Sequence, residues 1–346
     1  MLNLPKVLIS AAITSLLTAS TVSADETKTW ELRGGQQWEQ VKTPATTQSI
    51  VDPELTHIET LIEGKQAPVA KRLAVQWFKT HGKDAPLRER ALFLLGQANY
   101  TIGDRIDAFY NFDELLDLYP ESRYFYPALQ RQYDIADSYL NGYPRVVLWV
   151  FDVGASEEAI EMLFRIQQRS PGSPLAEKAL LRTADYYYGD SQFDLASDTY
   201  NAFVKSYPRS PQIPRVRLRQ AFSNYAQFRG LKFDVTPIID AREQLAAIEA
   251  QYPAMAAEEN LQPVIDRIDA TFARKIFVTG DFYERTHELR AAAYQYKFLL
   301  KTYPRSPDAK VAQNRLDHLP PHISKSIDPP GGNGYGPATA PSADSR

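Results

Sequence analysis

Residues 292–307 read AAYQYKFLLKTYPRSP, and residues 196–211 read ASDTYNAFVKSYPRSP. In both stretches an alanine, an aromatic residue and a further large apolar residue stand eleven, seven and four positions before the tyrosine of a Tyr-Pro-Arg-Ser-Pro motif. These three positions share one face of an α-helix, and a proline directly after the tyrosine ends a helix. The pattern therefore predicts a helix that buries one face and stops at the Tyr-Pro pair.

The same pattern recurs along the chain at irregular intervals. Counted back from Tyr119, Ser170, Tyr207, Tyr252 and Tyr303, the residue eleven positions earlier is an alanine in every copy, namely Ala108, Ala159, Ala196, Ala241 and Ala292. An earlier copy fits with Ala70, Ala74 and Trp77 in the helix and Gly82 at its end. A small residue at a fixed place on a buried face lets a neighbouring helix approach closely. The repeat therefore predicts paired helices, with these alanines and the four motif tyrosines as packing residues.

A second helix type precedes the first within each pair. Residues 86–100 and 174–188 align so that Gly96 matches Ala184, and a Gly-Asp pair follows each stretch at 103–104 and 189–190. We therefore predict a helix, a tight Gly-Asp turn, and a second helix that ends at Tyr-Pro. Since one such pair cannot bury its apolar face alone, consecutive pairs are expected to stack. The predicted fold is all-α: a tetratricopeptide-type α-solenoid of about five to six helix pairs over residues 57–319.

The turn, the alanine, the aromatic residue and the Tyr-Pro-x-Ser run resemble the tetratricopeptide repeats of the BamD family, periplasmic scaffolds of the outer-membrane β-barrel assembly machinery. Less closely, they resemble YbgF-type cell-envelope repeat proteins. Residues 264–319 match the BamD layout best, in which a linker helix runs into a Gly-x-Phe-Tyr turn and then into a helix that ends at Tyr-Pro. The matching residues are Gly280, Phe282, Tyr283, Ala292, Tyr303 and Pro304. BamD proteins carry a lipobox cysteine, whereas this chain has none, so we expect no direct lipid anchor and attachment through a partner.

The two ends differ from the repeats. Residues 1–24 combine Lys6, an apolar run and small residues before Ala24, as a secretory signal peptide does. Residues 25–56 lack apolar periodicity and are predicted to be a linker, in which Trp30 and Trp38 either dock on the first helices or recognise a partner. Residues 320–346 are rich in proline and glycine and are predicted to be a disordered tail.

Two sequence features are candidate partner-binding sites. The first is the apolar run at 146–151, with Val146, Leu148, Trp149 and Phe151, which is either a turn tucked into the solenoid or an exposed patch for a partner.

The second feature is a small basic cluster. Arg215 and Arg219 share a helix face, so they either pair with neighbouring carboxylates or dock an acidic partner surface.

Composition disfavours several chemical roles. The chain of 346 residues has 39 Lys and Arg against 42 Asp and Glu, so a nucleic-acid partner is not expected. No cysteine is present, and the i,i+4 histidine pair, His318 and His322, is split by two prolines. There is no Gly-x-Ser-x-Gly elbow, phosphate loop or dinucleotide fingerprint. We therefore predict no catalytic residues, no metal site and no cofactor.

The resemblance implies a non-enzymatic periplasmic scaffold, peripheral at the outer membrane through its partners, that acts in outer-membrane β-barrel protein assembly. Its implied partners are a POTRA-bearing outer-membrane barrel protein and unfolded barrel substrates. Two alternatives stay open: a YbgF-like coordinator of the cell envelope or of division, and a peptidoglycan-active enzyme on a helical superstructure. The enzyme would need a carboxylate with a strongly shifted pKa in a cleft.

Overall fold

The computed structural model describes residues 29–33, 37–41, 52–83, 85–143, 145–147, 150–152 and 155–324. The chain divides into two compact units, Met1–Ile50 and Val51–Arg346. The predicted signal peptide lies outside the described residues, and so does the predicted tail beyond Ser324.

The first unit contains an antiparallel hairpin of β1 (Thr29–Arg33) and β2 (Gln37–Val41), with Leu32 paired opposite Trp38. This hairpin lies in the segment predicted as a linker. Its strands have five residues each, and Trp30 and Leu32 follow the period of two of a strand and not the period of a helix.

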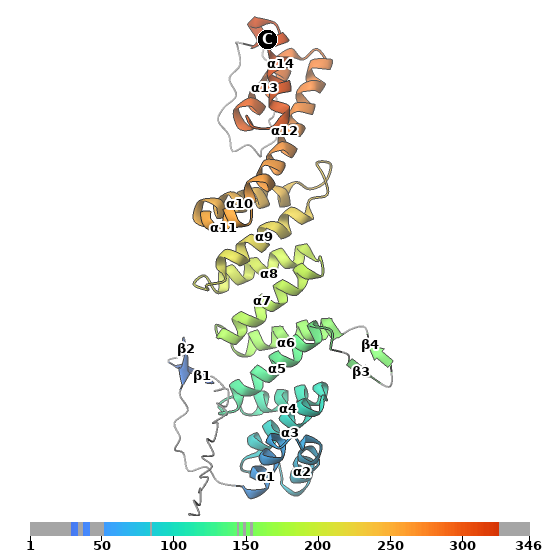
Figure 1. Cartoon of the computed structure of the whole chain (residues 1–346), viewed down its shortest axis with the longest axis vertical. Helices are drawn as coiled ribbons and strands as arrows, with labels where there is room; N and C mark the ends of the chain where they lie inside the picture. Colours follow the sequence, from blue (N-terminus) through green and yellow to red (C-terminus); the bar gives the residue numbers. More distant parts are fainter. Residues whose placement is uncertain are drawn as a thin grey trace, which may run out of the picture. The chain divides into compact units, whose positions relative to one another are not determined.

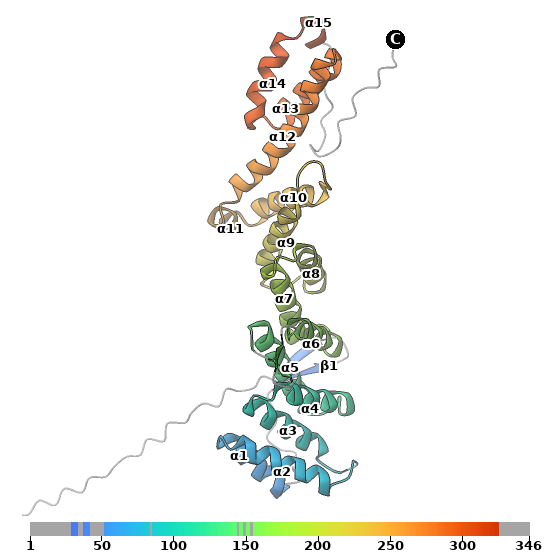
Figure 2. The same cartoon turned by 90° about the vertical axis from the view of Figure 1, so that its right-hand side faces the viewer.

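The second unit is the helical repeat, and within its described part the helices form six antiparallel pairs. The pairs are α1 (Pro53–Glu63) with α2 (Ala67–Thr80), α3 (Arg88–Ile102) with α4 (Arg105–Leu118), α5 (Phe125–Leu140) with α6 (Ala155–Arg169), α7 (Pro174–Gly189) with α8 (Phe193–Ser206), α9 (Ile213–Gln227) with α10 (Thr236–Gln251), and α12 (Leu261–Arg285) with α13 (Leu289–Thr302). Each helix packs mainly on the helices next to it in sequence, as Figures 1 and 2 show. The predicted all-α solenoid is confirmed, with its first helix four residues before the predicted boundary.

Shorter elements complete this unit. A hairpin of β3 (Arg145–Val147) and β4 (Val150–Asp152) is inserted between α5 and α6, and α11 (Pro253–Glu258) connects α10 to α12. After α13, α14 (Pro307–His318) packs on both α12 and α13. A single turn, α15 (Pro321–Ser324), lies inside the segment predicted as a disordered tail.

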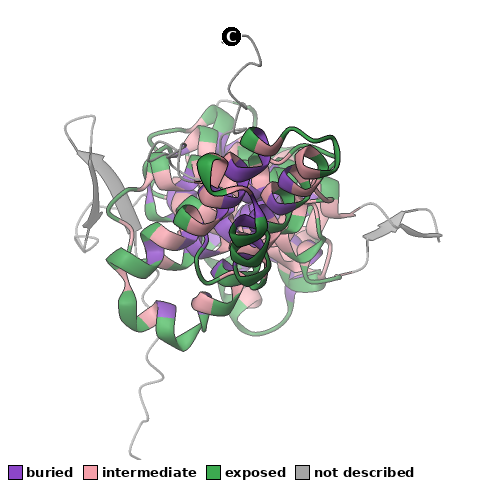
Figure 3. Ribbon diagram, turned by 90° about the horizontal axis from the view of Figure 1, so that it is seen from above, coloured by how far each residue is buried: buried purple, intermediate pink, exposed green. Residues whose placement is uncertain are grey.

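The core follows the stripe that the sequence repeats. All five alanines eleven residues before the reference positions are 0% exposed. The large residues seven positions before them are also 0% exposed, and these are Phe112, Leu163, Tyr200, Leu245 and Tyr296. Viewed along the stack, buried residues lie where helices face one another and exposed residues lie on the outside (Figure 3). Each of these pairs is therefore held by the same contact between a small residue and large ones.

A close approach of backbone and ring fixes the pairing of helices within a repeat. A Cβ atom on Gly96 of α3 would lie 2.5 Å from Phe112 of α4, and one on Gly280 of α12 would lie 2.7 Å from Tyr296 of α13. Ala184 of α7 stands at the equivalent position, sixteen residues before Tyr200. Only a very small residue fits where the ring of the second helix meets the first helix.

The turn between the two helices of a pair has a recurrent backbone shape. One residue in each of five turns is left-handed: Lys65, Gly103, Gly142, Ser191 and His287, with φ between 59° and 90°. The next amide donates a hydrogen bond to the carbonyl five residues earlier, as from Asp104 to Asn99 at 2.9 Å. This geometry closes the first helix by satisfying one of its free carbonyls.

Two predicted turns are corrected by this geometry. Gly189 is the last residue of α7, and the left-handed residue is Ser191, not the glycine of the Gly-Asp pair. Gly280, Phe282 and Tyr283 lie inside α12, a helix of 25 residues, so the Gly-x-Phe-Tyr segment is helical. The glycine is needed there because of the Tyr296 ring and not because of a turn.

The second helix of a pair ends at its motif tyrosine. Tyr119, Tyr207, Tyr252 and Tyr303 are the C-cap residues of their helices, with φ between −133° and −127° and ψ between 56° and 64°. Each tyrosine amide still donates to the carbonyl four residues before it, as from Tyr303 to Leu299 at 2.7 Å. The following proline requires an extended residue before it, which ends the helix at this point. Among the described helices, none is long and apolar enough to cross a bilayer.

Candidate protein-binding surface

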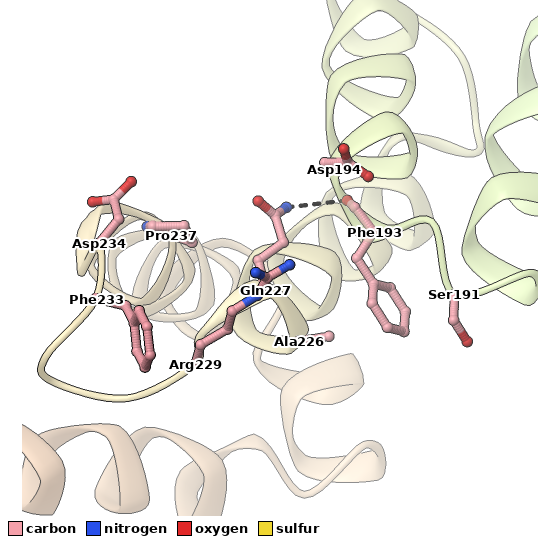
Figure 4. A pocket seen from close by; sticks show the side chains of 9 residues that line it. All are labelled: Ser191, Phe193, Asp194, Ala226, Gln227, Arg229, Phe233, Asp234 and Pro237. Atoms are coloured by element: carbon pink, nitrogen blue, oxygen red, sulfur yellow. Dashed lines mark hydrogen bonds between the residues drawn. The ribbon is translucent and has the colours of Figure 1, made fainter.

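A hollow of about 470 Å³ lies between the turn that joins α7 to α8 and the loop that joins α9 to α10. Its lining residues come from these two segments and from the helix ends beside them, and are Ser191, Phe193, Asp194, Ala226, Gln227, Arg229, Phe233, Asp234 and Pro237. In Figure 4 the side chains of Gln227 and Arg229 are drawn between the rings of Phe193 and Phe233. The hollow therefore offers two aromatic rings with one cation between them.

The α9–α10 loop is what builds this hollow. Gly230 has φ +116°, a left-handed value that favours glycine, and it turns the chain away from α9. Gln227 Nε2 donates a hydrogen bond of 3.1 Å to the Phe193 carbonyl and so ties the end of α9 to the start of α8 (Figure 4). Phe233 then stands on the loop with 63% of its surface exposed.

A phenylalanine that is so exposed loses the favourable free energy of burial unless a partner covers it. A partner side chain that is apolar or aromatic would pack on Phe233 and Phe193. A neighbouring carboxylate or carbonyl of the same partner would accept hydrogen bonds from Arg229.

Asp234, one of the two carboxylates that line the hollow, does not have the raised pKa of a general acid. The backbone amide of Thr236 donates to Asp234 Oδ1 at 2.9 Å, and hydrogen bonds with this amide and the Thr236 side chain lower the pKa of Asp234. A general acid at neutral pH needs a raised pKa instead.

The two predicted arginines face α7. Arg215 Nη2 donates to Asp185 Oδ2 at 2.7 Å, and the guanidinium of Arg219 lies 4.8 Å from the ring centre of Tyr188. Asp185 also accepts a hydrogen bond of 2.6 Å from the Tyr200 hydroxyl. Both arginines therefore join α9 to the preceding repeat: Arg215 pairs with a carboxylate, whereas Arg219 packs on an aromatic ring. Their role in partner binding stays a prediction.

The predicted apolar run forms the β3–β4 hairpin. Val146 pairs opposite Phe151 through the backbone. Leu148 and Trp149 lie outside the described residues, as do the side chains of Val146 and Phe151. The role of this run in partner binding stays a prediction.

Phe193, Arg229 and Phe233 were not predicted from the sequence as binding residues. A signal was present, because Tyr207 and Tyr252 are 45 residues apart whereas Ser170 and Tyr207 are 37 residues apart. The extra length falls in the α9–α10 loop, since α9 ends at Gln227 and α10 begins at Thr236. An insertion in one repeat of a solenoid is a common place for a binding surface.

Within the residues that the structure describes, no group of three or more His, Asp or Glu is placed to hold a metal ion. Glu121, the carboxylate that directly follows the first Tyr-Pro pair, is exposed in a turn, whereas the enzyme alternative needs a carboxylate in a cleft.

A family model matches the part of the repeat that contains the hollow. The model of the family YfiO, described as "Outer membrane lipoprotein", matches residues 151–318, which hold α6 to α14 and the whole hollow. No curated protein matches the chain. The C-terminal part of a TPR repeat-containing protein from Cytophaga hutchinsonii is 13% identical over 75% of this chain and 86% of that chain, with a TM-score of 0.36. PilW, described as a widely conserved type IV pilus biogenesis factor, is 14% identical over 75% of this chain and 97% of that chain, with a TM-score of 0.28.

Proposed function

Because residues 151–318 match the YfiO family of outer membrane lipoproteins, a BamD-like family of tetratricopeptide type, we propose that this chain is a protein-binding scaffold at the outer membrane that takes part in β-barrel protein assembly. The scaffold acts by holding partner proteins on its repeats and carries out no reaction of its own. It stays at the membrane through the partners that it binds, among them a POTRA-bearing barrel protein and unfolded barrel substrates.

One observation carries this proposal: the matched residues contain both the regular repeats and the hollow with its exposed ring of Phe233. A rigid stack presents such a ring at low entropic cost, because the backbone around it is already ordered. Partner binding on this surface is therefore the role that the geometry supports best.

Co-purification tests the assembly role. The tagged chain is isolated from detergent-solubilised envelopes of its own organism, washed with moderate salt, and its bound proteins are identified by mass spectrometry. We expect a POTRA-bearing outer-membrane barrel protein among them. Recovery of peptidoglycan synthases or Tol–Pal components in its place would overturn the assembly role in favour of an envelope coordinator.

A variant of the hollow tests the proposed surface. Phe233→Ala removes an exposed ring, so the fold should be unchanged while partner recovery falls several-fold, as expected when a central aromatic contact is lost. Leu118→Ala is the matched control, since Leu118 is 56% exposed on α4, away from the hollow. Equal recovery by both variants and the wild type would exclude this hollow as the binding surface.

A further inference from the structure

A second hollow, of about 580 Å³, lies between α6 and the α7–α8 turn. It is lined by Ser156, Glu157, Ile160, Tyr186, Tyr187, Asp190, Gln192 and Leu195. It shares none of these residues with the hollow around Phe233. Its walls combine two tyrosines, two aliphatic side chains and two carboxylates, and the lining contains no lysine or arginine.

The two carboxylates have no cation among the described residues. Glu157 forms no ion pair and no hydrogen bond there, and Asp190 accepts a hydrogen bond only from the neutral amide of Gln192. Two carboxylates elsewhere between the helices of this stack show the contrast, because each is paired with an arginine. Asp185 lies 2.7 Å from Arg215, and Asp269 lies 2.7 Å from Arg242. The hollow is therefore a place of uncompensated negative charge.

The two carboxylates interact with opposite ends of a helix dipole. Glu157 is in the first turn of α6, where the positive end of the helix dipole favours a carboxylate. Asp190 is the C-cap residue of α7, where free carbonyls already carry partial negative charge and a cation is the favoured neighbour. The position of Asp190 is thus unfavourable in the isolated chain and would become favourable once a positive group entered the hollow.

The walls suit the stem of a long basic side chain. Tyr186 and Tyr187 offer aromatic rings, and Leu195 is 42% exposed beside them. Lysine and arginine pack their methylene groups on such surfaces while the charged end reaches carboxylates or the face of an aromatic ring. This hollow therefore contains the three groups that such a side chain needs: an aromatic ring, an aliphatic wall and a carboxylate.

We propose that this hollow binds an arginine or lysine side chain presented by a protein partner. The inference rests on the proposed scaffold function and adds the chemistry of the partner, a basic segment that reaches the edge of the stack between α6 and α8. Binding places the positive charge between Glu157 and Asp190, with the stem on the tyrosine rings.

A peptide selection tests this chemistry and does not require the partner to be identified. Random nine-residue peptides displayed on phage are selected on the full chain and, in parallel, on the double variant Glu157→Gln/Asp190→Asn. The matched control is Asp198→Asn/Glu249→Gln, which removes the same charge from exposed positions of α8 and α10.

We expect wild-type selection to enrich peptides with arginine or lysine at one fixed position. The best synthetic peptide should bind the double variant about tenfold more weakly, as the loss of two partly exposed charge pairs implies. The control variant should bind it as the wild type does. Selected peptides without basic enrichment, or equal affinity for the wild type and the double variant, would overturn the inference.

Partner capture separates this inference from the proposed function. If the wild type recovers its envelope partners and the double variant recovers them equally well, the basic-segment inference fails and the scaffold function stands. If the wild type recovers no envelope partner, the scaffold function itself fails.

Discussion

Gly96 and Gly280 show how one residue fixes the distance between two helices. Each glycine lies in the first helix of a pair, against the ring of Phe112 or Tyr296 in the second. Nothing lies within 4 Å of the space that a Cβ on Gly189 would fill, although Gly189 also lies in a first helix. Gly96 and Gly280 therefore share a packing role that Gly189 does not have.

This difference gives the first prediction. Gly96→Ala should lower the free energy of unfolding by about 2 kcal/mol, because the ring of Phe112 has to move out of a packed position. Gly189→Ala should raise it by up to about 1 kcal/mol, because alanine favours the helix and meets no obstacle. Urea unfolding followed by circular dichroism measures both. A stabilising Gly96→Ala would contradict the close approach.

Asp52 ties the first helix to the second. Its carboxylate accepts hydrogen bonds from the amides of Glu54 and Leu55, at 2.8 and 3.2 Å, and from the indole nitrogen of Trp77 at 3.1 Å. Partial burial alone would raise the pKa of Asp52, but these hydrogen bonds, that of Trp77 foremost, lower it below its ordinary value of 3.8. The ionised carboxylate therefore caps α1 and satisfies a buried indole.

The second prediction concerns this carboxylate. Asp52→Ala should cost about 2 kcal/mol, because a helix cap and the partner of the Trp77 indole are lost together. Since the folded-state pKa is lowered, the contribution of the charge is fully present above pH 3.8 and is lost as the pH falls through the folded-state value. Asp52→Asn should therefore differ from the wild type at pH 7 and converge with it at strongly acidic pH. Urea midpoints at several pH values test this, and a constant difference would contradict it.

At the scale of single residues the sequence was informative where a residue type recurs at a helical period. All five alanines eleven positions before the reference residues are fully buried, because the same contact is made in each repeat. Arg215 and Arg219 were correctly placed on one helix face. Their partners, Asp185 and Tyr188, lie about 30 residues earlier in the sequence. These contacts form only when consecutive repeats stack, so helical spacing alone does not reveal them. Phe233 was missed because a loop residue belongs to no period.

At the scale of elements, the turn after the first helix recurs in five of the six described pairs. Ser191 and His287 adopt the left-handed conformation, with φ of 62° and 63°, where Gly103 stands in another pair. A side chain in this conformation costs about 1 kcal/mol relative to glycine. These turns thus carry backbone strain that the packing of the helices outweighs.

The third prediction uses this strain. Ser191→Gly and His287→Gly should each raise the thermal midpoint, with a gain of up to about 1 kcal/mol in the free energy of unfolding. Gly103→Ala should have the opposite effect, because its φ is +90° and the new Cβ would lie 3.0 Å from the Tyr143 hydroxyl. Scanning calorimetry compares the three variants. A loss of stability in both glycine variants would show that the serine and histidine side chains outweigh the strain.

The C-terminal ends of the second helices that stop at a Tyr-Pro pair were predicted correctly, because the proline restricts the backbone of the tyrosine before it. The first helices and their turns were less accurate. Gly280 to Tyr283 continue α12 although a glycine followed by aromatic residues is typical of a turn, since the tertiary contact with Tyr296 explains that glycine. The two hairpins were missed because their strands are three to five residues long and have no helical period.

At the scale of the whole repeat unit, packing is between neighbours. The buried residues of α1 to α3 form one cluster, and those from α9 to α14 form another that shares none of them. A defect in one pair is therefore expected to loosen that pair and its neighbours first.

The fourth prediction follows from this organisation. Ala292→Leu adds a large side chain at a position that is 0% exposed, so it should destabilise α12 to α14 by about 2 kcal/mol and speed their amide hydrogen exchange. Exchange in α1 to α4 should be unchanged. Ala257→Leu, at an exposed position of α11, is the control. Uniform loss of protection along the whole unit would show that it unfolds in one step.

The shared geometry of Tyr119, Tyr207, Tyr252 and Tyr303 has a consequence for how such a chain is inherited. Because these four pairs leave their second helices with nearly the same backbone angles, a duplicated or deleted segment that runs from one Tyr-Pro to the next keeps the same junction geometry at both of its ends. The ancestors of this protein could therefore gain or lose whole pairs without redesigning the contacts on either side. Recombination can thus change the number of helix pairs, whereas the backbone geometry of the Tyr-Pro junction has to stay the same.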